Sequence, residues 1–243
     1  MVMKKLKDII KQSSNIVFFG GAGVSTESNI PDFRSVRGLY KTKSNYSYPP
    51  EVMISHSFFV DHTEDFYHFY RERMIFKDAK PNEAHKALAK LEERGKLKAV
   101  ITQNIDGLHQ MAGSKNVYEL HGSIHRNYCM NCGKKFDLDY IINSETIIPK
   151  CDVCGGIVKP DVVLYEEGLN SDIINNATRL VQQADVLIIG GTSLVVYPAA
   201  NLVHYYKGEN LVLINKSTTS YDSQANLVIH DSIGDVLKNA IED

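Results

Sequence analysis

Short apolar segments rich in β-branched residues recur along the chain. They lie at 15–20, 98–104, 116–120, 185–190, 210–215 and 226–230. Several are apolar on both faces, which is typical of parallel strands covered by helices on both sides. Helical patterns occur at 2–12, 58–75, 81–94, 171–183 and 197–206. This alternation predicts an α/β fold built on a doubly wound parallel sheet.

Two segments interrupt the alternation without ending it. A long segment rich in Tyr and Phe follows the first strand, and a second segment contains all four cysteines. We therefore expect one domain of two parts, with function in the cleft between them. The large part comprises 1–35, 81–122 and 161–243, and the small part comprises a helical insertion, 36–80, and a cysteine-bearing insertion, 123–160.

Composition narrows the classes of function. The chain has 243 residues, 43% of them hydrophobic, and a formal net charge of −2 from 27 basic and 29 acidic residues. No overall field attracts nucleic acid or acidic lipid, so neither is a predicted partner. No apolar run approaches the roughly 18 residues of a membrane span, and the first residues lack a signal-peptide core. A cytoplasmic protein is expected.

The cysteines form two C-x-x-C pairs, Cys129/Cys132 and Cys151/Cys154, separated by 18 residues. This is the spacing of a zinc ribbon with four thiolate ligands. Two disulfides or a redox pair are the alternatives, and the paired spacing in a cytosolic setting favours zinc. Four thiolates leave no open coordination position, so the predicted zinc is structural.

A glycine-rich turn, Gly21-Ala22-Gly23-Val24-Ser25-Thr26, follows the first strand. Such a turn before a helix presents backbone N–H groups to a phosphate. The third glycine of the usual dinucleotide fingerprint is missing, and the chain continues into a loop with Pro, Phe and Arg instead of a second strand ending in an acid. The glycines alone favour a phosphate ligand only weakly over a tight turn.

Three further polar clusters follow predicted strands: residues 102–107, His121-Gly122 and residues 191–193. Ligands of open α/β sheets bind at the carboxyl ends of the strands. One such cluster could be an ordinary loop with helix caps. With the glycine turn there are four at the same edge, and together they indicate a ligand site.

Together these motifs resemble the sirtuins, the NAD-dependent protein lysine deacylases, and specifically a bacterial-type catalytic core. The resemblance spans nearly the whole chain. It is carried by GAGVSTESNIPDFRS (21–35), TQNID (102–106), LHG (120–122), the four cysteines, KPDVVLYEE (159–167), GTSLVVYPAA (191–200) and Ile214-Asn215.

The resemblance implies a Rossmann-like fold in which 36–80 carries the cofactor loop and 123–160 forms the zinc ribbon. It implies that NAD is consumed as a co-substrate, with one structural zinc per chain and acyl-lysine proteins or peptides as partners. The implied NAD contacts are Ala22, Gly23, Ser25, Thr26, Phe33, Arg34, Gln103, Ile105, Asp106, Gly191, Thr192, Ser193, Asn215 and the backbone near Ile233.

The implied catalytic residues are His121 and Asn104. Cleavage of the nicotinamide–ribose bond lets the acyl oxygen capture the sugar carbon, and a histidine with a pKa of about 6.5 can then take a ribose hydroxyl proton. The products are lysine, nicotinamide and 2′-O-acyl-ADP-ribose. Two short apolar strands, 162–164 and 194–196, would pair with the substrate peptide. The implied peptide contacts are Val163, Leu164, Tyr165, Leu194 and Val195.

The match departs from the family at two places. Sirtuins usually carry Phe-Gly-Glu where this chain has Tyr165-Glu166-Glu167, and usually glycine at Asn29, a residue type that tolerates left-handed backbone. The charge of Glu166 suggests a bias toward basic residues flanking the acyl-lysine.

A second comparison concerns the acyl group. Desuccinylating sirtuins hold an acidic acyl group with a Tyr-x-x-Arg pair. Here Tyr70 lies three residues after Tyr67, and Arg71 comes one residue late. One helical residue is a rotation of about 100°, which turns the guanidinium away and favours neutral acyl groups.

Three other functions compete with the deacylase. The closest is protein ADP-ribosylation from the same NAD site, and His121 with the peptide strands favours deacylation. A zinc-dependent module that binds acyl-lysine or NAD without turnover would not need a base at a strand end. A dehydrogenase is least favoured, because the third glycine and the ribose-binding acid are missing. His85, His109 and His125 are interpreted as packing or surface residues.

Overall fold

The structure is a computed structural model that describes residues 2–35, 38–40 and 46–242. Six strands form its main sheet, in the order β3-β2-β1-β7-β8-β9 with every neighbouring pair parallel. This confirms the predicted doubly wound α/β fold, with a change of direction in the strand order between β1 and β7. The strands are β1 (Ile16–Gly20), β2 (Leu97–Thr102), β3 (Val117–Glu119), β7 (Val186–Gly190), β8 (Asn210–Ile214) and β9 (Leu227–Ile229).

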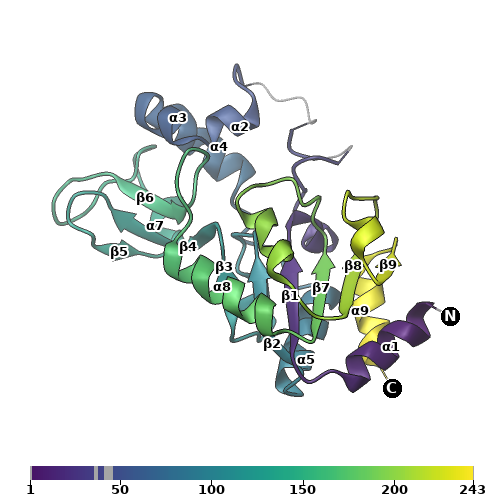
Figure 1. Ribbon diagram of the computed structural model, residues 1–243. Helices are drawn as coiled ribbons and strands as arrows, with labels where there is room; N and C mark the ends of the chain where they lie inside the picture. Colours follow the sequence, from purple (N-terminus) through teal and green to yellow (C-terminus); the bar gives the residue numbers. More distant parts are fainter. Residues whose placement is uncertain (1, 36–37, 41–45, 243) are drawn as a thin grey trace.

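Helices cover both faces of this sheet (Figure 1). On one face lie α1 (Val2–Gln12), α5 (Glu83–Glu93) and α9 (Ile233–Ile241), and on the other lie α8 (Ser171–Gln183) and the 3₁₀ helix η3 (Ala199–Tyr205). Strand β1 explains the arrangement, because Phe18 packs into the first core and Phe19 into the second, and both are fully buried. A strand with both faces in apolar cores reads as a continuous apolar run.

A smaller antiparallel sheet, in the order β5-β4-β6, lies to the left of the main sheet in Figure 1. It consists of β4 (Gly122–Cys129), β5 (Lys135–Phe136) and β6 (Val158–Val162), with α7 (Leu138–Ile142) beside it. The helices α2 (Pro50–Met53), α3 (His56–Asp61) and α4 (Thr63–Arg73) share a third apolar core with this sheet. The insertions at 36–80 and 123–160 thus pack on each other. Residues 36–37 and 41–45 of the first lie outside the described residues.

Several elements differ from the sequence-based expectation. The helix expected at 58–75 is two helices, because His62 leaves helical geometry at φ −132° and ψ 48° between α3 and α4. The helix expected at 197–206 is the 3₁₀ helix η3. The strand expected at 162–164 ends with β6 at Val162, and no strand forms at 194–196, where Leu194 has φ 56°. Short apolar runs cannot by themselves distinguish a strand from buried irregular chain.

The remaining elements are short. They are α6 (Leu108–Met111) and the 3₁₀ turns η1 (Ala22–Val24), η2 (Thr26–Ser28) and η4 (Asp222–Gln224). Among the helices of the described residues, none is long and apolar enough to cross a membrane.

Candidate active site

The glycine turn and the loop after β7 meet at the carboxyl edge of the sheet, where the strand order changes direction. The Gly23 N–H donates to the Gly191 carbonyl at 2.8 Å. A Cβ on Gly23 would lie 2.8 Å from the Gly191 Cα, and Gly191 itself has φ 59°. The absence of side chains at Gly23 and Gly191 therefore allows these two loops to lie in direct contact. Ala22 opens η1, so its N–H lies outside the bonding of that turn and can face an anion.

The glycine turn contains the 3₁₀ turn η1, and a second 3₁₀ turn, η2, begins at its last residue. The Thr26 hydroxyl donates to the Gly23 carbonyl at 2.9 Å and closes the turn on itself. Asn29 ends η2 in the left-handed conformation, with φ 63°. This is the backbone position where the family usually has glycine, and asparagine tolerates it.

A buried hydrogen-bond network joins the glycine turn to the segment after β2. The Ser25 hydroxyl donates to the Asp106 carboxylate at 2.6 Å and accepts from the Asn104 side-chain amide at 3.0 Å. Asp106 also accepts from the Leu108 N–H at 2.9 Å. Ser25 is 1% exposed and Asn104 8% exposed. The structure thus brings together three predicted residues from two strand ends, each held in a fixed orientation.

His121 lies between β3 and β4, and its ring is fixed by one hydrogen bond. Its Nδ1 is 3.0 Å from the Gln103 carbonyl, which can only accept, so Nδ1 carries the proton. Nε2 is then left with a lone pair. Burial lowers the pKa of His121 below its ordinary value of 6.5, against a smaller raising effect of the Gln103 bond. The imidazole is neutral at pH 7 and can act as a base through Nε2.

Gln103 connects His121 to the loop after β7. Its side-chain amide donates to the Thr192 hydroxyl at 3.1 Å. Thr192 and Asn215 exchange two hydrogen bonds of 3.0 Å each, which join the ends of β7 and β8. Ser193 is exposed beside them, whereas Ile233 is only 3% exposed. The Ile233 side chain belongs to the first core.

Phe33, Arg34 and Ile105 lie toward the small part of the molecule. The ring of Phe33 is half-buried with its centroid 5.5 Å from that of Tyr40, and the Arg34 guanidinium lies over the same Tyr40 ring at 5.4 Å. Ile105 packs against the third core, and its carbonyl accepts from the Ile124 N–H at 3.0 Å. Phe33 and Arg34 thus contact Tyr40, and Ile105 is bonded to β4.

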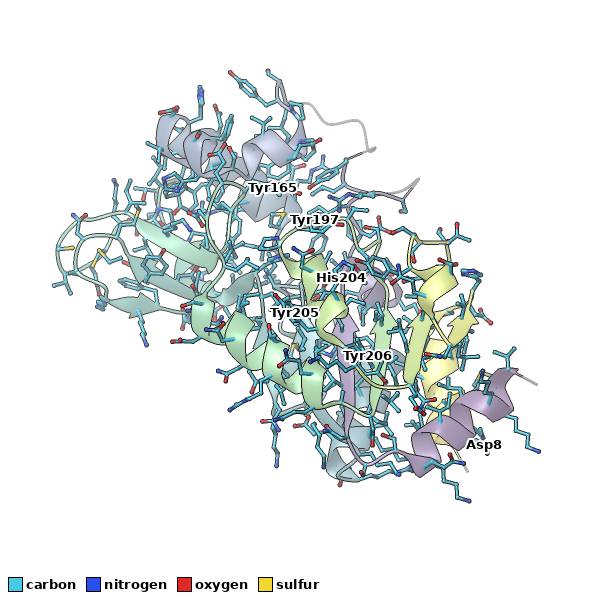
Figure 2. All side chains as sticks on the ribbon, viewed as in Figure 1. Asp8, Tyr165, Tyr197, His204, Tyr205 and Tyr206 are labelled. Atoms are coloured by element: carbon cyan, nitrogen blue, oxygen red, sulfur yellow. The ribbon has the colours of Figure 1, made fainter. Side chains whose placement is uncertain are left out.

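The predicted peptide residues fall into two groups. Leu164 and Leu194 are 4% and 2% exposed, so they support the loops from inside. Val195 and Tyr165 are 51% and 38% exposed, and Figure 2 places Tyr165 between α2–α4 and the main sheet. The Val163 N–H donates to the His121 carbonyl at 3.0 Å. The segment after β6 is therefore joined directly to the candidate base.

The structure adds two residues to the site: His125, which was interpreted from the sequence as a packing or surface residue, and Asn82, which carried no sequence signal. The His125 Nε2–H donates to the Asp106 carbonyl at 3.0 Å and so positions the backbone of that acid. The Asn82 side-chain amide donates to the Val24 carbonyl at 2.7 Å and to the Ser28 hydroxyl at 3.0 Å. Both contacts join segments far apart in sequence, so no local pattern could have revealed them.

His85 and His109 are packing residues, as expected. Their ring centroids lie 4.7 Å apart, and they are 0% and 1% exposed. Burial lowers the pKa of His85 to about 4 and that of His109 to about 3, the proximity of His85 adding to the effect at His109. Both rings are neutral at pH 7.

A cavity of about 790 Å³ lies behind the glycine turn, on the side of α4. It is lined by Glu27, Ser28, Asn29, Arg71, residues 75–82 and Ile142. None of the strand-end candidates is among these described lining residues. The cavity is therefore separate from the network of Ser25, Asn104 and Asp106.

The four cysteines gather at the outer end of the small sheet. Their sulfur atoms all lie within 4.8 Å of one another, with Cys129 to Cys154 at 3.4 Å and Cys132 to Cys151 at 3.7 Å. Sulfurs on a tetrahedron around zinc, each about 2.3 Å from the metal, are about 3.8 Å apart. The donor set and its spacing fit a metal ion with four thiolate ligands.

Comparison with known proteins places the chain among similar sequences and structures. Residues 21–198 match the Sir2 family. The chain is 73% identical to an NAD-dependent protein deacetylase of Clostridium acetobutylicum over 98% of each sequence. It is 74% identical to one of Clostridium tetani over 99% of this chain and 97% of the other.

A solved Sir2 structure is described as containing a deacetylated p53 peptide and 3′-O-acetyl ADP-ribose. It matches with a TM-score of 0.90 and 41% identity, over 99% of this chain and 98% of that one.

Proposed function

The chain belongs to the Sir2 family, and on that premise we propose that its strand-end cluster is the active site of an NAD-dependent protein lysine deacetylase. The enzyme uses NAD as a co-substrate and transfers the acyl group of lysine to ADP-ribose. The observation that carries the assignment is the orientation of His121. Its Nδ1 proton is committed to the Gln103 carbonyl, and its own carbonyl is bonded to the peptide-side segment at Val163.

NAD is proposed to bind across the end of β1 and β7, where the strand order changes direction. The Ala22 N–H and the small residues of the glycine turn would meet the pyrophosphate, and the pair Thr192–Asn215 would meet the adenosine end. Asn104 and Asp106, held by Ser25, would orient the nicotinamide end. Gly23, Thr26, Phe33, Arg34, Gln103, Ile105, Gly191, Ser193 and Ile233 complete the proposed set.

NAD supplies the chemistry of an activated ribose carbon, which becomes electrophilic as nicotinamide leaves. The acyl-lysine oxygen is the proposed acceptor of that carbon. His121 would take a ribose hydroxyl proton at Nε2, and Asn104 would hold the ribose face in place through its fixed amide. The half-buried Phe33 ring would limit water beside the reacting carbon.

Zinc is proposed at the four thiolates, in a structural role. The sulfur separations support a closed tetrahedral site that leaves no position for substrate. Since free thiolates at such a site require reducing conditions, a cytoplasmic location stays our prediction. Absence of direct nucleic-acid or membrane partners also stays a prediction.

The substrate is proposed to be a neutral acyl-lysine in an extended peptide. Val163, Tyr165 and Val195 are the proposed contacts, with Leu164 and Leu194 supporting them. The Tyr67 hydroxyl donates to the Val158 carbonyl at 2.5 Å, and Arg71 donates to the Thr146 carbonyl at 3.1 Å. Both side chains are thus engaged elsewhere, which supports acetyl over acidic acyl groups.

The proposed bias toward basic flanking residues finds less support. The Glu166 carboxylate accepts from the Ser57 N–H at 2.9 Å and from its hydroxyl at 2.6 Å, at the start of α3. These two bonds, of which the one from the Ser57 hydroxyl has the larger effect, lower the pKa of the Glu166 carboxyl and keep it ionised. Part of its charge is therefore directed at α3, and we expect only a modest preference for basic peptides.

The experiment is a mass-spectrometric assay of an acetyl-lysine peptide incubated with the protein, with and without NAD. Loss of acetyl only with NAD, with release of nicotinamide, is the expected result. Nicotinamide release with ADP-ribose on protein and an intact acetyl group would favour the ADP-ribosyltransferase alternative. Binding of NAD or peptide with no turnover would contradict both enzymes.

A further inference from the structure

Two tyrosine hydroxyls join the NAD side of the site to the peptide side. The Oη atoms of Tyr40 and Tyr165 are 2.9 Å apart, so one hydroxyl donates to the other. We propose that this pair couples the two ligands, so that acyl-lysine peptide strengthens nucleotide binding and nucleotide strengthens peptide binding. The inference rests on the proposed function, because it requires NAD beside Phe33 and Arg34 and a peptide beside Tyr165.

Tyr40 contacts both Phe33 and Arg34, two of the residues proposed to bind NAD. Its N–H donates to the Phe33 carbonyl at 2.9 Å, and the next N–H back along the chain, that of Leu39, donates to the Asp32 carbonyl at 2.7 Å. Its ring contacts the Phe33 ring and lies under the Arg34 guanidinium. A displacement of the Tyr40 side chain would therefore also move Phe33 and Arg34, which pack against its ring.

Tyr165 is anchored on the peptide side by its own backbone. Its N–H donates to the Ile54 carbonyl at 3.0 Å, and its carbonyl accepts from the His56 N–H at 2.9 Å. Glu166 binds Ser57 directly after it. Three successive contacts thus fix this segment to the junction of α2 and α3, and the Tyr165 hydroxyl is the part that reaches across to Tyr40.

The same segment also reaches the candidate base. Val163, two residues before Tyr165, donates its N–H to the His121 carbonyl. Because the backbone of this segment is already held, a peptide pairing with it would act on the half-exposed Tyr165 side chain and restrict its motion. Ordering Tyr165 restricts Tyr40 through the hydroxyl bond, and a nucleotide that binds next meets Phe33 and Arg34 already positioned.

The coupling depends on a hydroxyl that a phenylalanine would lack. Position 165 is the place where sirtuins usually have phenylalanine, a side chain with the same ring and no donor. Tyr165→Phe therefore removes the bond and retains the apolar contact. A neutral hydrogen bond of this kind contributes a factor of about 2 to 12 to an equilibrium.

The test measures the coupling directly by calorimetry. The dissociation constant of an acetyl-lysine peptide is determined with and without saturating ADP-ribose, an unreactive nucleotide, for wild type, Tyr165→Phe, Tyr40→Phe and the double variant. Tyr205→Phe is the matched control, because Tyr205 is a 46% exposed tyrosine on η3, away from this contact (Figure 2).

We expect ADP-ribose to tighten peptide binding in wild type and in the control. Each single variant should reduce that enhancement by about 2- to 12-fold, and the double variant should lose no more than either single one. An unchanged enhancement in the single variants, additive losses, or no enhancement in wild type would overturn the proposal. Wild-type deacetylation, assayed in parallel, distinguishes failure of this coupling from failure of the proposed function.

Discussion

At the scale of single residues, the proton on Nδ1 of His121 decides what the side chain can do. The Gln103 carbonyl holds that proton, and burial keeps the ring neutral, so Nε2 is available as a base at pH 7. Ser25, Asn104 and Asp106 form a separate network that has no such free basic nitrogen. We therefore propose that proton abstraction and substrate orientation are carried out by different groups.

Replacing the base should remove turnover and retain binding. We expect His121→Ala to lower the deacetylation rate by about 10² to 10⁴, because that is what a positioned general base contributes. Zinc content and NAD affinity should stay near the wild-type values. The matched control is His68→Ala, an exposed histidine on α4, which should leave the rate unchanged. Turnover of His121→Ala at the wild-type rate would remove His121 from this role.

The pH dependence follows from the direction of the His121 pKa. The proposed base is the neutral form, and burial shifts the pKa of His121 below 6.5. Activity should therefore be near its maximum at pH 7 and fall tenfold per pH unit below the lowered pKa. Measurement of kcat/KM between pH 5 and 8 tests this. A decline that begins above pH 7 would show that another group controls the reaction or that the His121 pKa is raised.

At the scale of elements, the strand ends were predictable and the loops between the parts were not. Parallel strands carry their polar residues to one edge, so the clusters at 102–107 and 191–193 could be assigned together from sequence. The segments at 162–164 and 194–196 were wrongly expected as strands, since a short apolar run is equally compatible with buried irregular chain. The bond from His125 to Asp106 depends on how β4 returns past β2, which no local pattern encodes.

The cysteine cluster, by contrast, was predictable, because its four ligands form two C-x-x-C pairs within one short stretch of sequence. Removal of a ligand should unfold the small sheet, since such a site can contribute on the order of 10 kcal/mol to folding of its own module. Cys132→Ser should lose zinc and lower the unfolding temperature, and activity should be lost with it. Val153→Ser, at an exposed position between Cys151 and Cys154, is the control expected to keep zinc. Full activity of folded, verified zinc-free protein would contradict the structural role.

At the scale of the whole molecule, the reaction depends on two parts that meet at the edge of the main sheet. The glycine turn and β7 belong to one, and the helices α2–α4 belong to the other (Figure 1). Tyr165, from a segment of the large part, is bonded to Ile54 and His56 at the junction of α2 and α3. The exact division of the chain into 1–35, 81–122 and 161–243 against 36–80 and 123–160 stays a prediction, although the third core joins both insertions.

The preferred acyl group is predicted from contacts inside the small part. Tyr67 and Arg71 are already bonded to Val158 and Thr146, so we propose that an acidic acyl chain would have to compete with these bonds for a partner. We expect kcat/KM for a succinyl-lysine peptide to be at least about tenfold below that for the matched acetyl peptide. Equal values for the two peptides would show that another cation reaches the acyl group.

The most direct test of the proposed reaction follows the acyl group itself. A peptide with a deuterated acetyl group on lysine is incubated with the protein and NAD, and the label is located by mass spectrometry. Acyl transfer predicts the label in O-acetyl-ADP-ribose, in equal amount to the nicotinamide released. Label released as free acetate from the start of the reaction, or retained on the peptide while nicotinamide accumulates, would contradict it.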